Sequence, residues 1–241
     1  MKQNELLEIW VYLSTSPLLG LTVTLLAYVL AYRVYLRCHA SPLANPVALA
    51  VALLISLLVL TKTPYKDYFD GAKFVHFLLG PATVALAIPL YKQMPTIKRV
   101  FIPLLLSLII GVLVGAVTAI YIAKLLGASK TTLLSLAPKS VTSPVAMSIA
   151  EHIGGLPSLT AALVVSTGII GAVFGPSLLK LLNIKDPSVM GVALGVTAHG
   201  VGTSRAFQLS AQAGAFAGLS MALSALANSI MLPWLVSWLP F

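Results

Sequence analysis

The sequence predicts an all-α fold, a polytopic transmembrane helical bundle with about eight spans. Of its 241 residues, 59% are hydrophobic and only 9% are charged. A soluble domain has about a quarter of its residues charged, so this composition is typical of a chain that lies in a bilayer. The apolar residues also form runs close to the ~20 residues that a helix needs to span a bilayer.

Short polar stretches separate the apolar runs and leave no room for a soluble domain. We therefore expect one transmembrane domain over residues 1–241, in the cell (inner) membrane. Tyr, Trp and Pro near the ends of the runs fit an interfacial aromatic belt. The expected spans are 17–36, 44–61, 74–91, 100–123, 132–153, 158–180, 188–209 and 214–238.

The basic residues gather in the connections between these runs. Positive loops beside spans are typical of membrane proteins, whereas a nucleic-acid-binding domain concentrates its charge in a patch beside a known motif. We therefore expect the lipid bilayer as a partner and no nucleic acid. Assigning the loops alternately to two sides gives eight cations against five, which predicts both termini in the cytoplasm. A single re-entrant segment would overturn that count.

The middle of the chain contains an internal repeat. Leu79–Val84 (LGPATV) matches Leu136–Val141 (LAPKSV) 57 positions later, and Lys124–Leu126 matches Lys180–Leu182 at an offset of 56. Transporters are often built from repeats with broken helices in corresponding places. The offset predicts repeat units over 74–126 and 131–183.

Prolines interrupt two of the predicted spans. Pro81 and Pro89 lie in the span 74–91, and Pro138 and Pro144 lie in the span 132–153. Proline removes a backbone donor and clashes with the preceding turn. We expect breaks near Pro81 and Pro138 that meet at mid-membrane, where unwound backbone offers N–H and C=O groups to an ion or substrate. Plain proline kinks are the alternative.

A cation follows the first proline of the fifth span. Lys139 is costly inside a bilayer unless it has a partner or water, so it could hold a substrate carboxylate or carry a proton. The alternative is that it extends to the interface. The expected substrate-binding residues in the two broken spans are Pro81, Thr83, Lys139, Ser140, Thr142 and Ser143.

The seventh span contains a second polar cluster. His199 lies on a face of small residues, and Arg205 can bind a carboxylate with two parallel hydrogen bonds, which Lys cannot. A packed histidine with an interfacial arginine is the alternative. The expected substrate-binding residues here are His199, Gly200, Gly202, Thr203 and Arg205.

Three residues are candidates for ion or proton coupling. Glu151 is the one acidic residue inside a predicted span, although it could equally mark the end of that span beside Gly154. His199 carries an imidazole, whose charge changes near neutral pH. Asn45 is a candidate too, or it only begins a helix before Pro46.

Enzyme motifs are missing from the sequence. It has no nucleotide-binding loop, no metal-ligand spacing and no hydrolytic triad in its usual context. We therefore expect no enzyme, no cofactor and no metal site. Cys38 is the single cysteine, so no intramolecular disulfide can form.

These polar motifs resemble the LrgB/CidB family over nearly the whole chain, and they are also similar to the membrane region of the plant plastid glycolate/glycerate translocator. The run PKSVTSP is the most specific of them. The resemblance rests on Asn45-Pro46, Gly80–Ala87, Ile88–Tyr91, Pro138–Pro144 and His199–Ala206.

The resemblance implies two competing functions. One is transport of a small organic anion, a monocarboxylate such as pyruvate, glycolate or glycerate, coupled to H+ or Na+. The other is a holin- or antiholin-like role in murein hydrolase export and autolysis. It also implies a small LrgA/CidA-type membrane partner, and we expect a homo-oligomer. Costly charges inside the membrane and paired broken helices favour the transporter, because a passive hole needs neither.

Overall fold

The computed structural model describes residues 17–39, 41, 44–85 and 87–238. Every regular element in that part of the chain is a helix, which confirms the predicted all-α fold. The described residues up to Ala85 form one compact unit and those from Ala87 onward form a second, and each is described by itself.

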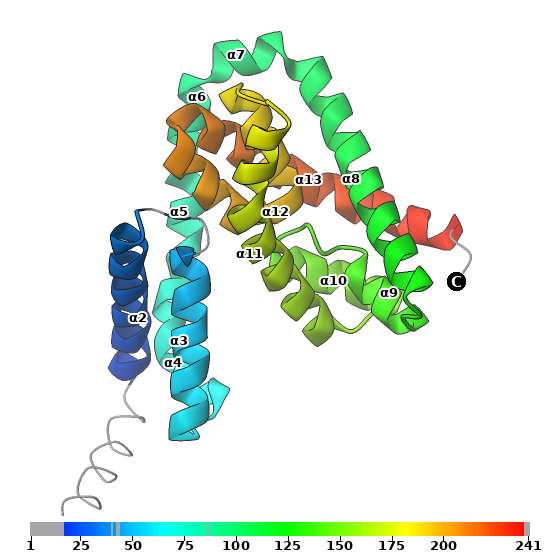
Figure 1. Cartoon of the computed structure of the whole chain (residues 1–241). Coiled ribbons are helices and arrows are strands. Elements are labelled where there is room, and N and C mark those ends of the chain that lie inside the picture. Colours follow the sequence, from blue (N-terminus) through cyan, green and yellow to red (C-terminus); the bar gives the residue numbers. More distant parts are fainter. Residues whose placement is uncertain (1–16, 40, 42–43, 86, 239–241) are drawn as a thin grey trace, which may run out of the picture. The chain divides into compact units, whose positions relative to one another are not determined.

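The described part of the first unit contains four helices, and α2 packs against both α3 and α4 (Figure 1). Thr24 and Tyr68 share a hydrogen bond of 2.8 Å that joins α2 to α4. The helices are α2 (Pro17–Arg37), α3 (Pro46–Thr61), α4 (Tyr65–Phe77) and α5 (Leu79–Ala85).

The predicted span 74–91 is interrupted close to Pro81. The helix ends at Phe77, and α5 begins after Leu78, so Pro81 lies in the first turn of α5. Proline is tolerated there because first-turn N–H groups have no intrahelical partner. The helix is therefore interrupted three residues before Pro81, in agreement with the predicted break near that proline.

The second unit contains three long helices and several short ones. Within the described residues, α2, α8, α11 and α13 are long and apolar enough to cross a membrane, and α3 is a shorter apolar helix. The helices of the second unit are α6 (Ala87–Lys92), α7 (Met94–Arg99), α8 (Phe101–Leu125), α9 (Lys130–Leu136), α10 (Ser143–Ile153), α11 (Pro157–Leu181), α12 (Pro187–Leu209) and α13 (Ala211–Trp238).

The three long helices of this unit alternate in direction along the chain. Leu104 of α8 lies in one core cluster with Phe216 of α13, and Ile120 lies in another with Leu232, so these two helices run the same way. Helix α11 is antiparallel to α13, because Leu179 clusters with Ala217 while Val164 packs near Ala225. Helices α8 and α13 therefore run in one direction through the unit, and α11 runs in the other.

The segment 130–153 does not cross the unit between α8 and α11. The chain folds back on itself, because Leu156 and Thr160, which follow α10, both bond to Ser135 near the end of α9. The Leu156 N–H donates to Ser135 Oγ over 2.8 Å and the Thr160 hydroxyl donates to the Ser135 carbonyl over 3.0 Å. Helix α9 carries the chain inward, residues 137–142 are non-helical, and α10 returns it. The break at Pro138 is confirmed, but the predicted span 132–153 is a re-entrant hairpin, here called the first hairpin.

Helix α12 also folds back on itself. Its backbone is non-helical at Ala198 and His199, where His199 has φ 41° and ψ −131°. Beyond this break Gly202 lies directly against the Leu194 carbonyl, and Gln212 at the start of α13 donates to Ser188 Oγ over 2.8 Å. The predicted span 188–209 is therefore a second re-entrant hairpin, with an inward arm (187–197) and a return arm (200–209).

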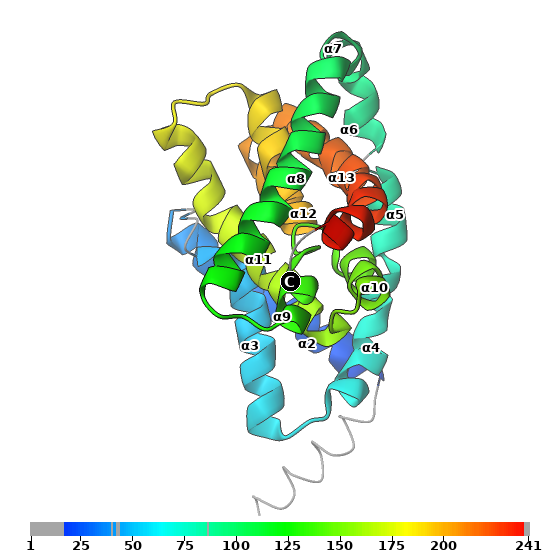
Figure 2. The same ribbon diagram turned by 90° about the vertical axis from the view of Figure 1, so that its right-hand side faces the viewer.

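The two hairpins enter from opposite ends of the unit. The first hairpin joins the end of α8 to the start of α11, and the second joins the end of α11 to the start of α13 (Figures 1 and 2). Helices α8 and α11 are both 25 residues long, and their caps Leu126 and Leu182 have nearly equal backbone angles. Each long helix is followed by a hairpin at an offset of 56 or 57, which supports the predicted duplication, although the repeat boundaries stay a prediction.

Candidate functional site

The tips of both hairpins contact the same turn of α11. Val141 in the first tip and Val164 of α11 belong to one core cluster, and both are buried. The Val164 carbonyl also accepts a hydrogen bond of 3.0 Å from Nε2 of His199, at the tip of the second hairpin. Two segments about sixty residues apart in the chain therefore meet within the second unit.

His199 is held tightly at its tip. The ring is buried, and Nε2 carries its proton because a carbonyl oxygen only accepts. A Cβ at Gly168 would lie 2.7 Å from both Cε1 and Nε2 of the ring, so only glycine fits at that position of α11. The Thr203 hydroxyl donates to the His199 carbonyl over 2.8 Å, in the first turn of the return arm. The positive φ of His199 is a strained conformation that this packing maintains.

The first tip presents a cation beside a helix N-terminus. Pro138 is fully buried, Lys139 is partly buried, and its Nζ donates to Ser140 Oγ over 3.3 Å. No ion pair involves Lys139 within the described residues. Thr142 occupies the N-cap of α10 without a side-chain bond to the first turn, which begins at Ser143. Free N–H groups and an ammonium together suit an anion.

The second tip also ends in a helix N-terminus. The return arm begins at Gly200, whose position is exposed, while Gly202 and Thr203 in its first turn are buried. Both tips thus direct the partial positive charge of a helix start into the unit, the arrangement that half-helices of carriers use for anionic groups.

Arg205 lies further along the return arm. It is about six residues, or about 9 Å, from the tip, and its Nη1 donates to Gln208 Oε1 over 2.6 Å. The place of Arg205 in a substrate site stays a prediction.

Glu151 is not at a tip. It lies in the last turn of α10, is exposed, and precedes Gly154, which ends the helix in the left-handed conformation. The structure therefore places it at the open end of the first hairpin, in agreement with the alternative that it marks the end of that segment. Its role in coupling stays untested.

The remaining candidates lie in the first unit. Pro81 is exposed on α5, and the side chain of Thr83 lies outside the described part. Asn45 is buried and caps α3, where Oδ1 accepts from the N–H groups of Val47 and Ala48 over 2.9 and 3.1 Å. This cap explains Asn45 as a helix start.

The LrgB-like family matches this chain over residues 24–238. The chain belongs to that family. The resemblance seen in the sequence is confirmed, and with its long apolar helices the protein is a multi-pass membrane protein. No solved structure matches the chain.

Three relatives illustrate the family. The uncharacterized protein YwbG of Bacillus subtilis is 39% identical over 75% of this chain and 80% of its own length. Holin-like protein CidB of Staphylococcus epidermidis is 31% identical over 71% and 75%. Antiholin-like protein LrgB of Bacillus mycoides is 30% identical over 70% and 74%. The last two names agree with the holin- or antiholin-like alternative, and neither refers to transport.

Helix α13 of this LrgB-like protein has a row of buried polar side chains. These residues were not predicted from the sequence as part of a site. Ser220, Ser224 and Asn228 are all buried and recur every four residues along an apolar helix. Asn228 Nδ2 donates to the Ser224 carbonyl over 2.7 Å, while Ser220 Oγ has no hydrogen-bond partner within the described residues. Their helical spacing is a signal that sequence reasoning could have used.

Metal ligands do not gather at this site. In the described ranges, no group of three or more His, Cys, Asp or Glu side chains lies close enough to hold a metal ion. The groups that the hairpin tips offer are an ammonium, hydroxyls, an imidazole and helix N-termini, which favour a small anion over a metal.

Proposed function

We propose that this LrgB-like protein is a secondary carrier of a small organic anion. One observation carries the proposal, namely two re-entrant hairpins that enter from opposite ends and touch the same turn of α11 at Val164. Non-helical backbone at membrane depth is tolerated where it is buried in protein or lines a wet cavity. Paired broken helices related by inverted repeats are typical of substrate sites in carriers.

Different residues at the two tips bind the carboxylate and exchange the proton. Lys139 and the start of α10 bind the carboxylate, and Ser140, Thr142, Ser143 and Thr203 lie near enough in the chain to supply hydroxyls. A monocarboxylate of the size of pyruvate, glycolate or glycerate carries one negative charge, which the Lys139 ammonium at the first tip would balance. His199 is the group at the tips that can exchange a proton, which makes H+ the first coupling ion to test and Na+ the second.

A holin- or antiholin-like role is the second candidate, and the comparisons support it more directly than they support the carrier. The relatives CidB and LrgB are named holin-like and antiholin-like, and the match includes about three quarters of the length of each. In that role the protein would modulate murein hydrolase export and autolysis, as a homo-oligomer or with a small LrgA/CidA-type partner. The long apolar helices α8, α11 and α13 would then also serve contacts between subunits.

Counterflow in proteoliposomes separates the two candidates. Vesicles containing the protein are loaded with unlabelled pyruvate, glycolate, glycerate or lactate, and the uptake of the labelled acid is followed with and without H+ and Na+ gradients. A carrier gives saturable counterflow that Lys139→Gln removes, whereas Lys180→Gln at the end of α11 retains it. A holin-like lesion instead releases a large trapped dye, without saturation and without dependence on Lys139.

A further inference from the structure

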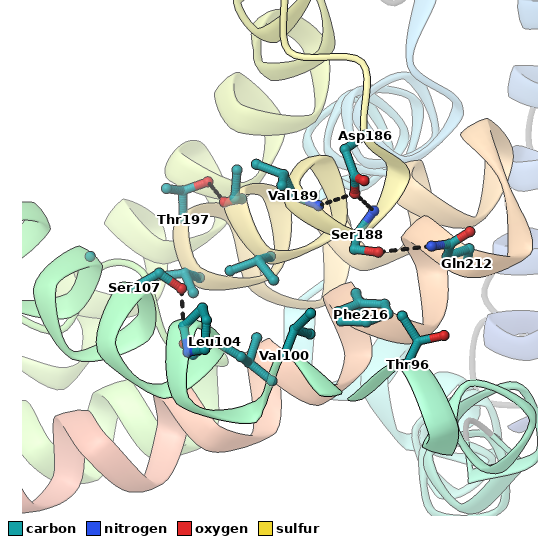
Figure 3. A pocket seen from close by; sticks show the side chains of 15 residues that line it. Thr96, Val100, Leu104, Ser107, Asp186, Ser188, Val189, Thr197, Gln212 and Phe216 are labelled. Atoms are coloured by element: carbon teal, nitrogen blue, oxygen red, sulfur yellow. Dashed lines mark hydrogen bonds between the residues drawn. The ribbon is translucent and has the colours of Figure 1, made fainter. Parts of the chain in front are cut away.

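A cavity of about 580 Å³ lies in the second unit, beside α8 and the inward arm of the second hairpin (Figure 3). Helices α8 and α12 form its walls with Leu104, Val189, Val192 and Val196, and Phe216 of α13 adds to them. Polar side chains gather at one end, where Thr96, Asp186, Ser188 and Gln212 line it. The cavity is therefore an apolar slot with a polar opening.

The length of the slot corresponds to one leaflet of a bilayer. It follows α8 from Val100 to Gly111 and α12 from Asp186 to Thr197. Each stretch rises by about 16 Å at 1.5 Å per residue. Half of a hydrocarbon core of ~30 Å is about 15 Å. The slot thus reaches from the helix starts to the level of the α12 break.

The polar opening has an excess of positive charge. Lys98, Arg99 and Lys185 are exposed and lie within two residues of lining positions. None of the three makes an ion pair among the described residues. Asp186 is the one acid at the opening, and its Oδ1 accepts from the N–H groups of Ser188 and Val189 over 2.7 and 3.1 Å. The basic side chains are therefore available to an anionic group.

The two hairpins determine which cations share an end of the unit with this opening. Because neither hairpin crosses the unit, the cations beside the ends of α8 and α11 gather mostly at one end. Positive charge favours the cytoplasmic side, where anionic lipids attract basic segments. The opening shares its end of the unit with Lys92, Lys98, Arg99, Lys180 and Lys185, against Lys124 and Lys130 at the opposite end.

We propose that this slot binds an anionic phospholipid of the cytoplasmic leaflet. One acyl chain lies between α8 and the inward arm of the second hairpin, and the phosphate lies at Lys98 and Arg99. The bound chain supports the inward arm on its membrane-facing side, since the slot ends at Thr197, two residues before His199. The site is separate from the proposed substrate site and holds whether the protein is a carrier or holin-like.

The test measures lipid binding to the purified full-length protein in detergent by native mass spectrometry. Phosphatidylglycerol and phosphatidylcholine with the same acyl chains are titrated separately. We expect phosphatidylglycerol to bind more tightly, and Lys98→Gln with Arg99→Gln to weaken it roughly 30-fold, at about a factor of five for each cation near the surface. The control removes the same charge at the opposite end, by Lys124→Gln with Lys130→Gln, and leaves the affinity unchanged.

A second pair of variants tests the slot itself. Ser107 lines the cavity on α8, while Thr118 is exposed on the same helix outside it. Ser107→Trp fills the slot and should abolish binding, whereas Thr118→Trp should not. Equal affinity for both lipids, or unchanged binding to Ser107→Trp, overturns the proposal. So does a dimer that Ser107→Trp dissociates, because the slot then receives a second copy of the chain.

Discussion

The substitution Gly168→Ala tests the packing of His199 directly. The new Cβ would lie 2.7 Å from Cε1 and Nε2 of the imidazole, whereas heavy atoms in contact are about 3.5–4.0 Å apart. The ring must therefore move by about 1 Å, which stretches the 3.0 Å bond from Nε2 to the Val164 carbonyl beyond hydrogen-bonding distance. Overpacking costs about 1–3 kcal/mol and the lost bond about 1 kcal/mol more.

We therefore expect Gly168→Ala to lower the free energy of unfolding by about 2–4 kcal/mol. Thermal unfolding in detergent, followed by circular dichroism, should show a Tm lower by roughly 4–16 °C. Gly115→Ala in α8 is the matched control, because a Cβ there meets nothing within 4 Å. If both variants have the same Tm as the wild type, His199 does not pack on α11, and the conclusion that the two tips meet there is wrong.

Three further predictions concern the two hairpins. Ser135→Ala should lower the free energy of unfolding by about 1–3 kcal/mol, because it removes the bond to the Leu156 N–H. Ser166→Ala is the control and should have the Tm of the wild type, because the Ser166 hydroxyl bonds to the Ala162 carbonyl of its own helix. Arg205→Lys should weaken substrate affinity roughly tenfold in counterflow, since a planar fork becomes a point charge, and an unchanged affinity would remove Arg205 from the site. His199→Gln should keep counterflow but lose pH-driven accumulation, whereas Glu151→Gln should retain both because Glu151 is exposed. Full accumulation by the His199 variant would favour Na+ coupling or an uncoupled mechanism.

The sequence was sufficient to predict the helices but not their paths. The predicted spans 17–36, 44–61, 100–123, 158–180 and 214–238 each correspond to one continuous helix, and the interruption near Pro138 follows from proline chemistry. Hydropathy measures the length of an apolar run and carries no information on direction. A re-entrant hairpin of about 20 apolar residues therefore looks like a span until tertiary contacts such as Ser135 with Thr160 are known.

The candidate site was predicted in part. Lys139 and His199 are both at hairpin tips, where intramembrane polar groups are most costly and most informative. Glu151 is exposed at the end of α10, and no local pattern distinguishes that position from a buried one. The bond from His199 to Val164 joins residues 35 positions apart, so only the folded chain shows it. Ser220, Ser224 and Asn228 were missed because serine and asparagine carry no charge and scattered hydroxyls are common in apolar helices.

Helix α11 determines how this unit can move. The first hairpin is fixed to its opening turn, where Thr160 holds the Ser135 carbonyl, and the second packs along it at Gly168 and Gly171. Opening the second tip alone would leave the His199 imidazole without its hydrogen bond to the Val164 carbonyl in a buried place, at a cost of about 1–3 kcal/mol. Moving α11 with both hairpins against α8 breaks none of these bonds. A carrier built this way would expose its site by displacing α11 and the hairpins together. A disulfide between α8 and the inward arm of the second hairpin, where Gly111 lies against Val196, should then stop counterflow while leaving substrate binding intact.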